Sequence, residues 1–194
     1  MLAALDLLRA VGLSGAGINR VIDRSGAPKG SLYHYFPGGK NELMAAALRR
    51  AELSVGDGLR RVFGRSARLD EKVRALFTAA GIAMEANKFD RGCPVAAVTL
   101  DLDDASEDLR EVCRAIFDVW LEIIAEGLEE VPVGDRREVA GLILATLEGS
   151  MILARARATK DVLLSAGARL ADALAVTFSP RRRPVKRRKQ SSHG

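Results

Sequence analysis

The sequence predicts an all-α fold, and three observations support this prediction. The 194 residues are rich in Ala, Leu, Arg and Glu, which favour helices. Aromatic residues, which favour strands, make up only 5% of the chain. Apolar residues recur at spacings of three and four in nearly every segment, the pattern of helices with one buried face. We therefore expect about nine helices and no strand.

The first forty residues are expected to form three short helices. The first covers residues 2–11, because its leucines recur every three residues until Gly12 ends the pattern. The second covers about 17–24. Gly26 can adopt the positive φ of a tight turn, so the third helix is expected over about 28–36.

Longer helices are expected in the rest of the chain. Pro and Gly clusters separate their apolar stripes, and Ser106 is expected to cap one of them. The expected ranges are 41–63, 69–87, 94–102, 106–130, 135–157 and 161–177.

Charge is unevenly distributed along the chain. Residues 1–50 carry a net +4, residues 51–180 a net −6, and residues 181–189 add seven basic side chains with no acid. A basic segment followed by an acidic one favours contact of the basic residues 1–50 with a polyanion. Chance variation of charge along the chain is the alternative explanation. The basic segment 179–194 is expected to be disordered, as a solubilising end, a DNA-binding arm or a membrane-surface patch.

Several classes of protein are excluded at this stage. No uninterrupted apolar run is long enough to cross a membrane, and the first residues lack the features of an export signal. Two cysteines are too few for a disulfide framework, so we expect a cytoplasmic protein. The motifs of metal sites, nucleophilic enzymes and phosphate-binding loops are missing, so neither an enzyme nor a cofactor is expected.

Residues 29–36 divide into two faces by helical phase. Leu32, Tyr35 and Phe36 lie at i, i+3 and i+4, and we expect them to anchor the helix. The other face combines a cation, small residues, a hydroxyl and an imidazole, which suits entry into a DNA major groove. This face contains Lys29, Gly30, Ser31, Tyr33 and His34.

Two segments carry a resemblance to a known family. Residues 24–43, RSGAPKGSLYHYFPGGKNEL, resemble the signature of the TetR family of transcriptional regulators. Residues 91–97, RGCPVAA, are similar to its LmrA/YxaF-like subgroup. The resemblance implies a three-helix DNA-binding domain over 1–45, with its helix-turn-helix at about 17–36. It also implies a larger helical domain over 46–178 that binds an effector and dimerises through its last two helices.

The resemblance also assigns residues to DNA binding. It implies that the polar face of residues 29–34 reads DNA and that Lys40 lies near a phosphate. A positive charge at a helix N-terminus is unfavourable because of the helix dipole unless an anion binds there, which favours a phosphate near Lys40. The alternative is a solvated lysine in a loop. Ala16 and Gly17 stand where the family often has the hydroxyl of Thr or Ser.

A small-molecule effector is expected to bind among apolar side chains of the second domain, although these residues also fit a plain core. Cys93 precedes Pro94 at a helix start, and a small buried filler is the preferred interpretation of this thiol. Redox sensing through a thiol pKa lowered by the helix dipole is the alternative. The candidate ligand-binding residues are Met84, Cys93, Phe117, Trp120 and Met151.

The sequence therefore predicts a cytoplasmic, homodimeric and ligand-responsive regulator. Its expected partners are a double-stranded, pseudo-palindromic operator and a small effector, and repression is the expected mode. The main alternative is a protein of the same fold that has lost DNA binding and sequesters a ligand or protein partner.

Overall fold

The computed structural model describes residues 1–103 and 106–178, and this part of the chain is entirely helical. It contains nine α-helices and one short 3-10 turn, Val133–Asp135. The basic segment 179–194 lies outside the described residues. The helices are α1 (Leu2–Gly15), α2 (Ile18–Ser25), α3 (Lys29–Tyr35), α4 (Lys40–Phe63), α5 (Leu69–Ala86), α6 (Pro94–Leu100), α7 (Glu107–Glu126), α8 (Arg136–Arg157) and α9 (Asp161–Phe178).

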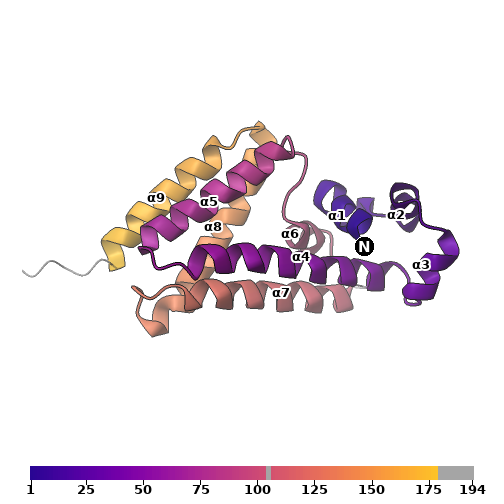
Figure 1. Ribbon diagram of the computed structural model, residues 1–194, viewed down its shortest axis with the longest axis horizontal. Coiled ribbons are helices and arrows are strands. Elements are labelled where there is room, and N and C mark those ends of the chain that lie inside the picture. Colours follow the sequence, from indigo (N-terminus) through magenta and orange to yellow (C-terminus); the bar gives the residue numbers. More distant parts are fainter. Residues whose placement is uncertain (104–105, 179–194) are drawn as a thin grey trace, which may run out of the picture.

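The helices form a small head and a larger body (Figure 1). The head consists of α1, α2 and α3, and the long helix α4 runs from it into the body beside α7. Helices α5, α8 and α9 pack together at the other end. The short helix α6 contacts α1, α4 and α7, so it lies where head and body meet. The two parts therefore share α4 and are in direct contact.

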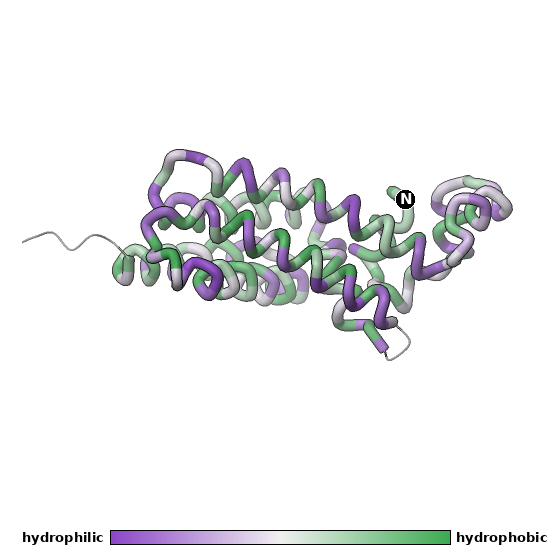
Figure 2. The backbone as a smooth tube through the Cα atoms, turned by 90° about the horizontal axis from the view of Figure 1, so that it is seen from below, coloured by the Kyte–Doolittle hydropathy of each residue, from purple (hydrophilic) through white to green (hydrophobic). Residues whose placement is uncertain are grey.

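A continuous apolar core holds the helices together. Figure 2 shows hydrophobic and hydrophilic residues alternating along each helix, as expected for helices with one buried face. Phe63, Phe77 and Trp120 are among the largest fully buried side chains. The indole Nε1 of Trp120 donates a hydrogen bond to the backbone oxygen of Glu52 over 3.3 Å, which joins α7 to α4.

The helix count and the boundaries match the predictions closely, with three corrections. Helix α1 bends at Gly12, where φ is +69°, but it continues for another turn to Gly15. Helix α7 ends at Glu126 rather than at residue 130. Ser106 occupies the N-cap position of α7, but its hydroxyl bonds to the Asp103 carboxylate and not to a backbone N–H of the helix.

One segment among the described residues, Val133–Arg157, is long and apolar enough to cross a membrane by length and composition. The core helix of a globular protein has the same properties. This segment consists of the 3-10 turn and α8, and α8 packs on α5, α7 and α9. Only 39% of its most apolar window is buried, so α8 also has an uncovered apolar side.

Candidate nucleic-acid interface and ligand cavity

A tight turn between α2 and α3 sets the direction of α3. Gly26 ends α2 with a φ of +66°, a conformation that favours glycine. The Ser25 hydroxyl stabilises the turn by accepting a hydrogen bond from the Ala27 backbone N–H over 3.2 Å. Leu32 is buried and Phe36 packs partly against the core, so this side of α3 holds it to the head. The opposite side is left free.

The polar side of α3 faces outward. Lys29, Gly30 and His34 are exposed, and Tyr33 is 46% exposed. Ser31 is partly buried. No atom lies within 4 Å of the Cβ that a side chain at Gly30 would have, so the backbone there is open to close approach. This side of α3 is therefore accessible to a binding partner as large as double-stranded DNA.

One residue of α3 is placed differently from the prediction. Tyr35 was expected to anchor the helix, but it is 72% exposed and its ring lies edge-on to that of His34, with a centroid distance of 5.1 Å. Leu32 and Phe36 make the contact with the core in its place. Tyr35 therefore extends the exposed aromatic and polar surface of α3.

Lys40 begins α4, and its ammonium group also contacts α1. The Lys40 Nζ donates a hydrogen bond to the backbone oxygen of Leu13 over 2.8 Å. This contact satisfies a carbonyl in the last turn of α1 and holds α4 against it. An ammonium group has three N–H donors, so Lys40 retains donors for an anion at this position.

The body contains a cavity of about 340 Å³ between α4, α5, α7 and α8. The loop between α5 and α6 closes one side of it, together with Arg9 of α1. The apolar lining includes Val55, Leu59, Val62, Leu76, Ala80, Met84, Trp120, Leu144, Leu147 and Met151. The polar and charged lining residues are Arg9, Asn87, Arg91, Cys93 and Glu148.

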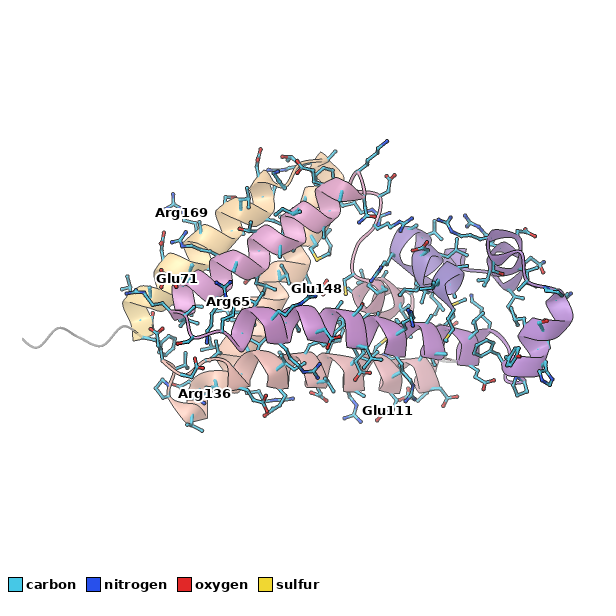
Figure 3. The ribbon with its side chains drawn as sticks, viewed as in Figure 1. Arg65, Glu71, Glu111, Arg136, Glu148 and Arg169 are labelled. Atoms are coloured by element: carbon cyan, nitrogen blue, oxygen red, sulfur yellow. The ribbon has the colours of Figure 1, made fainter. Side chains whose placement is uncertain are left out.

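Glu148 brings a carboxyl group into this apolar lining. Figure 3 shows it between α8 and the place where α4 and α6 meet. Burial raises the pKa of Glu148, and a hydrogen bond from the Cys93 thiol offsets only part of this effect. Burial and the nearby carboxylate of Glu148 also raise the pKa of Cys93 well above its usual value. The alternative of a lowered Cys93 pKa is therefore wrong, and a raised thiol pKa does not favour redox sensing.

Four of the five candidate ligand-binding residues line the cavity: Met84, Cys93, Trp120 and Met151. Phe117 does not line it. Its ring packs edge-on against Trp120 with a centroid distance of 5.7 Å, so it supports a lining residue from behind. Among the described residues, no group of His, Cys, Asp and Glu side chains is arranged to hold a metal ion.

The wall of the cavity that faces the head is bonded directly to α1. The Gly92 backbone N–H donates to the backbone oxygen of Arg9 over 3.1 Å. The Arg91 guanidinium pairs with the Asp6 carboxylate over 3.0 Å. The loop that lines the cavity and α1 are therefore directly connected.

Sequence reasoning missed Glu148 and Arg91, although each had a detectable signal. Glu148 lies four residues after Leu144 and three before Met151, so it interrupts the apolar stripe of α8. Arg91 lies within the RGCPVAA segment, beside Cys93. Neither signal predicted that the two residues would share a cavity.

Comparison with known proteins agrees with this architecture. Residues 1–47 match the family model of bacterial regulatory proteins of the TetR family. Residues 70–169 match the model of the C-terminal domain of LmrA/YxaF-like transcriptional regulators. An uncharacterised HTH-type transcriptional regulator of Mycobacterium tuberculosis is 33% identical over 81% of this chain and 82% of its own length. The regulator LmrA of Bacillus subtilis is 28% identical over 89% and 93%.

Solved structures show the same fold. The regulatory protein TetR from Rhodobacter sphaeroides superposes with a TM-score of 0.80 at 22% identity, over 88% of this chain and 94% of that one. The regulator CifR, solved with a 26-bp double-stranded operator, gives a TM-score of 0.78 at 23% identity, over 89% and 93%. The chain therefore belongs to the TetR family of bacterial DNA-binding transcriptional regulators, which are not enzymes, and it carries an LmrA/YxaF-like C-terminal domain.

Proposed function

We propose that this protein is a homodimeric repressor that a small, largely apolar effector releases from a pseudo-palindromic operator. The observation that carries the proposal is the outward-facing polar side of α3, held in place by Leu32. As a regulator that acts on bacterial DNA, the protein works in the cytoplasm. The proposed DNA-binding unit is residues 1–45, and the proposed effector-binding and dimerising unit is residues 46–178.

The proposed DNA-contacting residues include groups that contact base edges and groups that bind phosphates. Gly30 and Ser31 are small enough to let the backbone of α3 enter a major groove, where Tyr33 and His34 reach base edges or phosphates. Lys29 supplies a positive charge beside them. Lys40 binds a phosphate with the donors left after its bond to Leu13.

The proposed dimer forms through the outer faces of α8 and α9. These faces expose large apolar side chains together with small residues that allow close helix packing. A monomer seldom leaves such a patch uncovered, and a second copy of the chain buries it. The residues are Leu142, Ala145, Ile152 and Leu153 on α8 and Ala173 and Val176 on α9.

A dimer places two copies of α3 on one side of the assembly. For successive major grooves the two helices must lie roughly 34–36 Å apart, so the operator has two related half-sites. An effector in the cavity presses on the loop that is bonded to α1. The effector favours a dimer in which the two heads have a spacing that does not fit the operator. Regulation requires the effector to bind this state more tightly than the operator-binding state, and a difference of about 1–3 kcal/mol is enough.

A mobility-shift experiment with the full chain and the DNA flanking its own gene tests the proposal. The protein shifts this DNA, and Lys29→Ala and Tyr33→Ala weaken binding while the dimer stays intact. Arg65→Ala is the matched control for loss of charge, because Arg65 lies in the body far from α3 (Figure 3). If no native fragment shifts at low salt, the alternative applies and the protein sequesters a ligand or partner.

A further inference from the structure

The charges around the cavity single out Glu148. Two cations line the same cavity, Arg9 on α1 and Arg91 on the loop between α5 and α6. Arg91 already pairs with Asp6 over 3.0 Å. Within residues 1–103 and 106–178, no ion pair joins either arginine to Glu148. Among the described residues the Glu148 carboxyl therefore has no ion-pair partner, and the neutral thiol of Cys93 is its hydrogen-bond donor.

An ionised carboxylate in apolar surroundings is unfavourable unless a cation compensates it. The lining around Glu148 consists mainly of Leu, Val, Ala and Met side chains with the indole of Trp120. We propose that the cavity binds a lipophilic amine in its ammonium form, with Glu148 as the counter-ion. This inference rests on the proposed function, since it names the chemical class of the effector.

Other ligand classes fit the cavity less well. A carboxylic acid or phosphate would leave the charge of Glu148 uncompensated even where it paired with Arg9 or Arg91. A neutral alcohol donates one hydrogen bond to the carboxylate but leaves the charge of the carboxylate uncompensated. An ammonium group donates a hydrogen bond and also compensates the charge. The indole of Trp120 also lines the cavity, and aromatic rings attract cations. A volume of about 340 Å³ is in the range of small-molecule sites.

Binding of the amine is coupled to a proton on Glu148. Burial raises the pKa of this carboxyl in the empty cavity, so part of the population is protonated as the pH falls toward that pKa. Only the ionised form attracts the ammonium group, so affinity decreases as the pH falls through the raised pKa. Cys93 stays a neutral thiol in this range because burial raises its own pKa. Arg9 and Arg91 are the other charged groups that face the cavity.

A matched pair of probes tests the inference on the full-length protein. Adamantanemethylamine is a cation near neutral pH, and adamantanemethanol has the same skeleton with a neutral hydroxyl. Trp120 is the single tryptophan of the chain and lines the cavity, so its fluorescence reports binding of either probe. Calorimetry gives the affinities. Glu148→Gln removes the charge, and Glu138→Gln removes the same charge from an exposed position of α8.

We expect the wild-type protein and Glu138→Gln to bind the amine at least about tenfold more tightly than the alcohol. This preference disappears in Glu148→Gln, which binds the alcohol as before. If the alcohol binds as well as the amine in the wild type, the cationic class is wrong while the cavity remains the effector site. If neither probe binds, both the inference and the effector part of the proposed function are overturned.

Discussion

The guanidinium of Arg155, near the end of α8, donates a hydrogen bond to the backbone oxygen of Ala10 on α1 over 2.7 Å. This contact joins the body to the head directly. Arg155 lies one turn after the cavity residue Met151 on the same helix. Together with the bond between Gly92 and Arg9, it connects two consecutive carbonyl groups of α1 to the body.

We predict that Arg155→Ala loosens α1 with little effect on overall stability. The contact is solvent-exposed, so its loss costs less than about 1 kcal/mol of the free energy of unfolding. Hydrogen exchange of the α1 amides increases, and operator affinity in a mobility-shift titration falls several-fold because the head is less well positioned. Arg157→Ala removes the same charge from an exposed position two residues later and leaves both measurements unchanged. Equal exchange in the two variants would contradict the prediction.

The helices of this protein could be predicted from sequence because their signals are local. Apolar spacing and the Gly and Pro residues between stripes are enough to place nine helices. The errors at Gly12 and at the end of α7 have another cause. Gly12 adopts a positive φ, as expected for a helix end, but Leu13 is buried and draws the chain into one further turn. Tertiary packing decided the boundary there.

The sites were harder to predict, because their chemistry depends on residues far apart in the chain. In a seven-residue helix, Tyr35 and Phe36 lie on either side of Leu32 by phase, and only the docking of α3 determines which of them is buried. The start of a helix offered a reactive Cys93 as an alternative. Burial, and after it the carboxylate of Glu148 from α8, raises the pKa of Cys93 instead, and no local pattern reveals either effect.

We predict that Lys40→Met weakens DNA binding by a similar factor for specific and non-specific sequences. A phosphate contact carries no base information, so its loss also reduces the slope of log affinity against log salt by about one unit. The melting temperature decreases slightly because the bond to Leu13 is lost. Lys88→Met, which changes an exposed lysine of the body, is the control and keeps the wild-type slope. A change confined to one operator sequence would argue against a phosphate contact.

We predict that Leu142→Glu converts the dimer to a monomer. Leu142 is 51% exposed in the single chain and lies on the uncovered apolar face of α8, so a carboxylate there opposes burial against a second copy. Sedimentation or light scattering measures the mass, and operator binding is lost together with the dimer. Leu53→Glu introduces the same group at an exposed leucine of α4 and stays dimeric. A dimeric Leu142→Glu would place the interface elsewhere.

We predict that Gly167→Ala destabilises the body by about 1–3 kcal/mol. Helices α5 and α9 approach so closely that a Cβ at Gly167 would lie 2.5 Å from the Cβ of Phe77, so the two helices must move apart. Gly141→Ala on α8 meets no atom within 4 Å and gains up to about 1 kcal/mol from better helix propensity. Thermal or urea unfolding compares the two variants, and equal stabilities would contradict the close packing.

We predict that Glu148→Gln and Glu129→Gln change stability in opposite directions near neutral pH. Burial raises the pKa of Glu148, so the ligand-free fold loses stability as the pH rises above the ordinary value of 4.5 toward the raised pKa, and Gln removes this loss. A hydrogen bond from Lys72 lowers the pKa of Glu129, so its stabilising contribution is present above 4.5 and is lost as the pH falls through the lowered pKa.

Urea unfolding over a range of pH measures both effects. Near neutral pH, Glu148→Gln is more stable than the wild type by about 1.4 kcal/mol for each unit by which the Glu148 pKa is raised. The gain disappears at acid pH, where the wild-type carboxyl is protonated in both states. Glu129→Gln is less stable than the wild type near neutral pH, because the buried Lys72 ammonium loses its charged partner. A pH-independent gain for Glu148→Gln would show that the effect comes from packing rather than from the charge.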